Sequence, residues 1–328
     1  MPRMMRLEKA QIIAAAPHFR AALDALAAPA QSTEMTTSAE PRNGLPFALG
    51  AYLIWGMMPL YIKLLTDISA FEVLANRVLW SLPVALGSVL VFRQAGEYKA
   101  ALQDRKKLAT MLASSALISV NWTVYMWAIM HEQVLATSLG YYLNPLVNVL
   151  LGRLVLGEKL NRWQGTAVAV AALGVGILLF EEPDTIWISV TLAMSFGVYG
   201  LVRKMAPVSS VPGLAVEVTL LAPFAALALG LGLASEAGFG SSTERSLILM
   251  GSGLITAIPL LLFATAARRM SYTALGFVQY MAPTIVFFLS VFLWKEPLYP
   301  EKLLCFACIW TAIAIFSADA VKRARTAG

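Results

Sequence analysis

Ten apolar stretches run through this chain of 328 residues, each near the length that a helix needs to cross a bilayer. Spanning the hydrocarbon core takes about 20 predominantly apolar residues. The stretches cover 44–65, 71–92, 108–130, 134–156, 162–180, 184–204, 211–233, 246–268, 271–294 and 301–320. They predict an all-α membrane protein with ten transmembrane helices.

The composition supports a membrane protein over a pair of soluble domains. Hydrophobic residues make up 59% of the chain and charged residues 13%, whereas soluble domains have about half and about a quarter. A soluble fold of this composition would have more apolar surface than it could bury. We therefore expect membrane lipid to surround most of the chain.

The net charge of +6 comes from basic residues that gather in alternate loops. Twenty of the 25 Lys and Arg residues fall in one set of segments, against three in the other loops and two, Lys63 and Arg77, within spans. That set comprises the N-terminal tail, 93–107, the residues around the 157–162 loop (Arg153, Lys159 and Arg162), Arg203 with Lys204, Arg268 with Arg269, and the C-terminal tail. The positive-inside rule then places both termini in the cytoplasm. A nucleic-acid reader would instead gather these charges on one soluble face, so we expect no nucleic-acid partner.

The segments outside the spans carry little chemistry. We expect residues 1–43 to form a cytoplasmic extension, disordered or a short amphipathic helix, because they contain no apolar core of a signal peptide. "MTTSAEPRNG" from Met35 resembles a natural start, so residues 1–34 are hypothesised to be absent from the mature protein; mass spectrometry that found them intact would contradict this. Residues 321–328 form a basic cytoplasmic tail. Cys305 and Cys308 lack further metal ligands nearby, so neither a metal nor a cofactor is expected.

The second half of the chain repeats the first. "LGYYLNPLVNVLLGRLVLGEKL" at 139–160 is similar to "LGFVQYMAPTIVFFLSVFLWKEPL" at 275–298, and in each a proline (Pro145, Pro283) precedes a glutamate (Glu158, Glu296) by thirteen residues. Further pairs agree at offsets of 140 and 141, among them Arg77 with Glu217 and Lys63 with Lys204. Two repeats, 44–182 and 183–320, would have five spans each, so they must cross the membrane in opposite senses. Inverted repeats are a recurrent design of secondary transporters; chance likeness between apolar helices is the alternative.

Several separated motifs resemble one family. They are "AYLIWGMMPLYIKLL", "NRVLWS" at 76–81, "NWTVYMWAI" at 121–129, "SLGYYLNPLVN" at 138–148, "YGLVRK" at 199–204 and "TALGFVQYMAPT" at 273–284. Together they resemble the RarD branch of the EamA-type drug/metabolite transporter superfamily, over about residues 44–320. The resemblance implies the five-plus-five inverted EamA-type fold and an exporter or permease of the bacterial inner membrane. It implies no particular substrate.

Polar side chains at mid-membrane depth mark a candidate substrate site. Tyr141, Asn144 and Asn148 share one helix face, and Tyr141 and Tyr142 align with Gln279 and Tyr280 in the second repeat. Polar groups facing lipid would lose hydrogen bonds. We therefore expect these side chains to face the interior, either lining a cavity or joining helices.

An ionisable pair lies within the second and seventh spans. Arg77 is the candidate ligand for a substrate carboxylate or phosphate, because a guanidinium binds such groups in bidentate fashion. Glu217 is the candidate proton carrier, since charges at this depth tend to mark transport pathways. A structural ion pair is the alternative, and whether Arg77 and Glu217 pair directly is left open.

Aromatic residues within the spans complete the predicted site, with packing in the core as the alternative. These additional candidates for substrate binding are Tyr52, Trp55, Asn121, Trp122, Tyr125 and Tyr199. An aromatic, mildly polar cavity would suit an amphipathic metabolite.

These features favour a secondary-active transporter of a small metabolite or drug that works by alternating access and is coupled to protons. A passive facilitator or channel is the alternative, because inverted repeats serve that function too. An enzyme is less expected, since the sequence has no G-x-S-x-G, H-E-x-x-H or P-loop motif. The small-residue spacing Gly165/Ala169 fits close helix packing, within the monomer or in a homodimer.

Overall fold

The computed structural model describes residues 44–181, 183–233, 238–295 and 300–327, and within these ranges every regular element is helical. Residues 1–43 and Glu296 lie outside the described residues, so the predictions made for them are not tested. The long helices of the first half are α2 (Leu45–Ile62), α3 (Ala70–Val91), α5 (Arg105–Met130), α6 (Val134–Leu154) and α7 (Arg162–Glu181). Those of the second half are α8 (Ile186–Met205), α9 (Ser210–Ala228), α10 (Thr243–Arg269) and α13 (Pro300–Ala327). Between α10 and α13 lie two shorter helices, α11 (Tyr272–Gln279) and α12 (Met281–Phe288).

Nine helical segments among the described residues are long and apolar enough to cross a membrane. The chain is therefore an all-α, multi-pass membrane protein, as the sequence predicts. Helix α6 has 21 residues and carries the polar residues Tyr141, Asn144 and Asn148. The count of ten spans stays a prediction that depends on α6.

Two local features were not predicted. A short helix, α4 (Ala95–Gln103), occupies the 93–107 loop, and Asp104 caps the following helix by accepting hydrogen bonds from the backbone N–H groups of Lys106 and Lys107. The predicted span 271–294 is broken at Tyr280 into α11 and α12. Pro283 explains the break, because it has no N–H to donate to the carbonyl four residues earlier.

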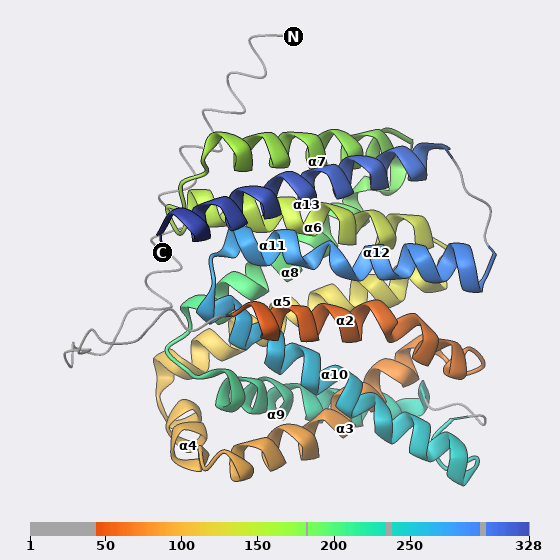
Figure 1. The fold of residues 1–328 in the computed structure, drawn as a ribbon. Coiled ribbons are helices and arrows are strands. Elements are labelled where there is room, and N and C mark those ends of the chain that lie inside the picture. The colour runs from red at the N-terminus through yellow and green to blue at the C-terminus, as the bar shows by residue number, and fades with distance from the viewer. Residues whose placement is uncertain (1–43, 182, 234–237, 296–299, 328) are drawn as a thin grey trace.

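The helix ends fall into two groups, as the alternating charges predict. At one end, which we call the basic end, hydrogen bonds join four segments: Glu97 accepts from the Ser209 N–H (2.6 Å), Arg268 donates to the Ala206 carbonyl (2.7 Å), and Glu158 accepts from the Tyr272 N–H (2.6 Å). The N-terminal end of α2 and the C-terminal end of α13 lie on this side with α4 (Figure 1).

At the other end, which we call the opposite end, Asp67 forms an ion pair with Arg245, and the rings of Trp127 and Trp187 lie 5.3 Å apart. Which of the two ends faces the cytoplasm stays a prediction.

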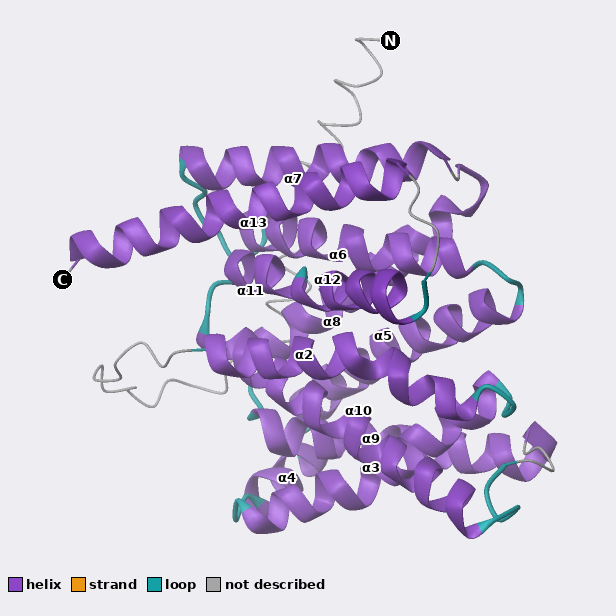
Figure 2. Cartoon of the chain, turned by 45° about the vertical axis from the view of Figure 1, so that its right-hand side comes forward, coloured by secondary structure: helices purple, strands orange, loops and turns teal. Residues whose placement is uncertain are grey.

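Helices of the two halves pack against each other in matched pairs. Helices α7 and α13 run side by side along one edge of the bundle, and α3 and α9 lie at the other (Figures 1 and 2). Between them α6 contacts α8 and α11, α5 contacts α8, and α2 contacts α10 and α12. Two five-helix repeats exchanged by a two-fold operation would give this pairing, although the repeat itself stays a prediction.

Close approach of backbones fixes two helix contacts, that of α10 with α3 and that of α11 with α6. A side chain on Gly253 of α10 would overlap the main chain of α3 at Trp80, where Ser81 donates to the Gly253 carbonyl (3.2 Å). A Cβ on Gly276 of α11 would lie 2.8 Å from the Pro145 carbonyl oxygen of α6. Small residues at such contacts let membrane helices pack closely.

We expect Gly253→Ala to lower the free energy of unfolding by about 1–3 kcal/mol, the usual effect of an added methyl group in a packed interior. Gly251→Ala on the same helix is the control, because its nearest neighbour, the Tyr61 hydroxyl, is at 3.5 Å. Denaturation of the two purified variants in the same detergent measures the difference. Equal stability would contradict the close α3–α10 packing.

Candidate substrate site

Arg77 of α3 points into the bundle, with 8% of its surface exposed. Its Nε donates a hydrogen bond to Thr256 Oγ1 of α10 (2.9 Å), and its guanidinium lies over the Trp122 ring of α5, 5.8 Å from the centroid. Within the described part of the chain no carboxylate pairs with Arg77. A deep guanidinium thus has a hydroxyl and a ring for neighbours, but no opposite charge among the described residues.

Three tyrosines surround this group. The hydroxyls of Tyr61, Tyr125 and Tyr141 lie near enough to interact electrostatically with the Arg77 charge, and the Tyr125 and Tyr141 rings are 6.0 Å apart. Of the Tyr141 surface, 45% is exposed. We call the set of Tyr61, Arg77, Trp122, Tyr125, Tyr141 and Thr256 the Arg77 cluster. Its residues come from five helices: α2, α3, α5, α6 and α10. In the first four, they lie in the part of the helix nearer the opposite end.

Glu217 of α9 pairs with a different arginine. Its Oε1 lies 3.5 Å from Arg203 Nε and accepts a hydrogen bond from Ser114, and its Oε2 accepts one from the Tyr199 hydroxyl (3.4 Å). Arg203 is 0% exposed and Glu217 2%. No contact between Glu217 and Arg77 is found among the described residues, so the Glu217 carboxylate is matched by Arg203.

Arg203 lies at the end of a span near the basic end, as the sequence predicts, but its side chain is fully buried. Arg203 belongs to the last turn of α8, and its Nη2 donates to the Ser210 carbonyl (2.9 Å) at the start of α9. Its guanidinium lies directly against Gly213, where any side chain would overlap it. The turn into α9 thus encloses the side chain.

The predicted amides mostly join helices. Asn148 of α6 donates to Gln279 Oε1 of α11 (2.8 Å), and the Tyr52 hydroxyl of α2 lies 3.4 Å from the same oxygen. Asn121 of α5 donates to the Leu192 carbonyl (2.9 Å) and to Ser195 Oγ (3.0 Å) of α8. These hydrogen bonds fit the packing alternative, because they satisfy buried groups between helices.

The remaining predicted residues are spread through the interior. Trp55 packs against Tyr52, Phe196 and Phe263. Asn144 Oδ1 and the Tyr280 hydroxyl are buried without a hydrogen-bond partner among the described residues. The structure thus brings Arg77, Trp122, Tyr125 and Tyr141 together, and it places the other predicted residues in separate contacts.

Sequence reasoning missed four residues that complete these contacts: Tyr61, Ser114, Arg203 and Thr256. Tyr61, Ser114 and Thr256 are polar side chains inside apolar spans, which is the signal that singled out Asn144. That signal does not tell a hydroxyl that bonds to another helix from one that bonds within its own helix. Ser88, for example, donates to the Val84 carbonyl of its own helix (2.8 Å).

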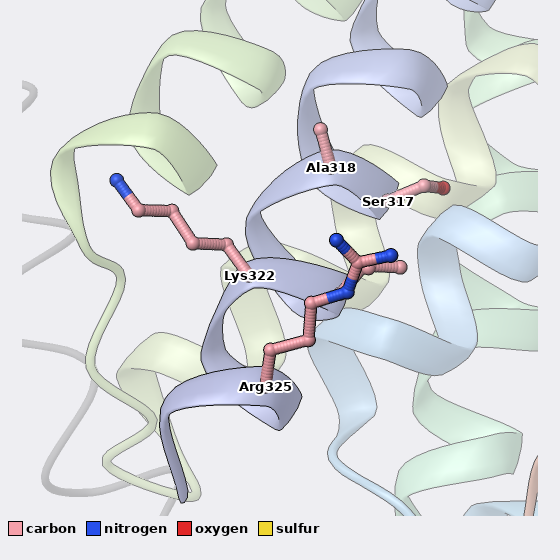
Figure 3. Close-up of a pocket in the computed structure, with 5 residues that line it drawn as sticks. Ser317, Ala318, Lys322 and Arg325 are labelled. Carbon is pink, nitrogen blue, oxygen red and sulfur yellow. The ribbon is translucent and has the colours of Figure 1, made fainter.

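A surface hollow lies apart from these groups. It occupies the C-terminal part of α13 and is lined by Ser317, Ala318, Val321, Lys322 and Arg325, with Lys322 and Arg325 extending in different directions (Figure 3). None of the predicted site residues lines this hollow.

Comparison with known proteins points to membrane transport. A model of the EamA-like transporter family matches residues 42–180. An uncharacterised transporter of Pseudomonas aeruginosa is 42% identical over 291 residues, covering 88% of this chain and 97% of that protein. Protein RarD of Streptomyces exfoliatus is 39% identical over 293 residues, covering 89% and 93%. Protein RarD of Salmonella typhimurium is 40% identical over 284 residues, covering 86% and 97%.

A solved crystal structure supports the fold. It superimposes with a TM-score of 0.69 at 18% identity and covers 85% of this chain and 98% of that chain. At that identity the likeness concerns the fold alone. The family match and the first of these relatives are described as transporters, which points away from an enzyme.

The Arg203–Glu217 pair generates a stability prediction. We expect Arg203→Met to lower the free energy of unfolding by about 3 kcal/mol, because removal of one partner leaves a buried charge unmatched. Adding Glu217→Gln should restore part of the loss, since a neutral amide then takes the place of the charge. Denaturation of the parent, both single variants and the double variant measures the coupling. Additive effects would contradict a direct pair.

Proposed function

This chain belongs to the RarD branch of the EamA-like transporter family, and from that premise we propose that it is a secondary transporter of the bacterial inner membrane. It moves a small metabolite or drug by alternating access, with both chain termini in the cytoplasm. The basic end accordingly faces the cytoplasm and the opposite end faces outward.

One observation carries the proposal: Arg77 is deep, and no carboxylate among the described residues balances it. A charge inside a membrane protein is costly and marks a pathway or a partner. A solute with a carboxylate or phosphate would supply the opposite charge, and the planar guanidinium suits either group. The rings of Trp122, Tyr125 and Tyr141 beside it offer apolar surface for the rest of the solute.

The two ends of the bundle differ in a way that fits alternating access. The exposed Tyr141 lies toward the opposite end, whereas Arg203, Glu217, Ser114 and Tyr199 are buried toward the basic end. Such a difference supports a pathway that reaches Arg77 from the opposite end while the basic end is closed.

The Arg203–Glu217 pair favours a second candidate, a facilitator without proton coupling. A proton that neutralised Glu217 would leave the buried Arg203 unmatched, so coupling through Glu217 requires Arg203 to find another partner. In proteoliposomes, a coupled carrier accumulates the solute against its gradient when a proton gradient is applied, and a facilitator only equilibrates it.

The role of Arg77 is tested by transport. Metabolites released by cells with and without the protein identify candidate solutes, which are then assayed in proteoliposomes. We expect Arg77→Gln to slow transport by at least about tenfold, because hydrogen bonds to a charged group contribute about 1.5–3 kcal/mol. Arg269→Gln is the control, since Arg269 lies over the Phe47 ring at the basic end, outside the Arg77 cluster. Full transport by Arg77→Gln would contradict the site.

Proton coupling is tested separately with Glu217→Gln. If Glu217 carries the proton, this variant loses the pH dependence of transport and retains exchange of solute down its gradient. The same pH dependence in the parent and in Glu217→Gln would remove Glu217 as the proton carrier and leave the role of Arg77 intact.

A further inference from the structure

We propose that the transported solute is an organic monocarboxylate. Its carboxylate pairs with Arg77 as the Glu217 carboxylate pairs with Arg203 at the basic end. The ion pair formed in this way closes the opposite end over the solute. This inference rests on the proposed function and adds to it the charge of the solute and the interaction that drives closure.

The two charged sites are built on matching positions. Arg77 and Glu217 are 140 residues apart, and the hydroxyl residues that bind them, Thr256 and Ser114, are 142 residues apart. The first pair joins α3 to α10 and the second joins α9 to α5; both helix pairs are in contact. Each half of the chain thus presents one charged side chain to a hydroxyl of the other half.

The two sites differ in whether the opposite charge is present. At the basic end Arg203 completes the site, and Ser114, Tyr199, Arg203 and Glu217 are all nearly or fully buried. At the Arg77 cluster, no acid within the described ranges forms an ion pair with Arg77, and Tyr141 stays 45% exposed. The complete ion pair goes with buried side chains, and the incomplete one with a tyrosine that stays exposed.

The charge balance selects a monoanion. Arg77 is the single cation of the cluster as described, and its electrostatic neighbours are tyrosine hydroxyls. One carboxylate balances one guanidinium. A phosphate monoester carries about −1.5 to −2 at neutral pH, so it would leave excess negative charge at a depth where unmatched charge is costly.

A carboxylate supplied by the protein itself tests the inference without a known solute. Thr256→Asp places an acid beside Arg77, and Thr256→Asn is the neutral match of the same size. Both are made in a background with Cys305→Ala, Cys308→Ala and the reporter Tyr141→Cys. A membrane-impermeant maleimide applied at the opposite end measures how fast the reporter is labelled.

We expect Thr256→Asp to slow labelling by about tenfold relative to Thr256→Asn, a shift of about 1.4 kcal/mol toward the closed state. Adding Arg77→Gln to Thr256→Asp should restore fast labelling, because the new acid then has no partner. Equal rates for the Asp and Asn variants would overturn the inference while the proposed function stands. A reporter that is not labelled even in the parent would contradict the accessible pathway itself, and both proposals with it.

A second experiment removes an acid at the basic end instead of adding one at the opposite end. The test then does not depend on the folding of one variant. Ser115 is buried beside Ser114 and its hydroxyl has no partner among the described residues, which makes Ser115→Cys a mild reporter. Glu217→Gln removes the acid and should speed labelling from the basic end by about tenfold. Glu217→Asp keeps the charge and should label slowly. Unchanged labelling in Glu217→Gln would contradict the role of the ion pair in closure.

Discussion

Inside a bilayer the hydrocarbon offers no hydrogen bonds, and this constraint shapes the whole molecule. A polar group in a span is costly unless it finds a partner within the protein. The backbone finds partners by forming helices, and several side chains find them across helices. Asn148 and Gln279 join α6 to α11, Asn121 and Ser195 join α5 to α8, and Arg203 and Glu217 join α8 to α9. The polar residues of α6 are thus part of what holds it in the bundle.

Arg77 departs from this pattern in a way that a purely structural role does not explain. A hydroxyl and an aromatic ring soften the cost of its burial, but they do not balance its charge. Arg203 shows how the same fold balances a buried guanidinium, with a carboxylate and a carbonyl in direct contact. The contrast between these two arginines is the physical basis for assigning solute binding to the first and closure to the second.

Glycines and prolines set where the helices can move and where they cannot. Gly253 lets α10 lie against the main chain of α3, and Gly276 lets α11 lie against Pro145 of α6. Closure of the opposite end would have to leave these contacts in place, because helices with backbones in contact slide past each other less readily than helices separated by side chains. The break at Tyr280 separates α11, which carries Gly276, from α12.

The sequence by itself determined the membrane class, the approximate bounds of the long helices and the grouping of their ends. These follow from local properties, namely apolar length and the position of Lys and Arg. It also singled out Arg77 and Glu217 as deep charges. Only the tertiary structure decided that Glu217 pairs with Arg203, that Asn148 bonds to Gln279, and that Tyr141 stays exposed while Asn144 is buried. Partner choice depends on how helices distant in the chain are rotated and crossed against each other, and no local pattern encodes that geometry.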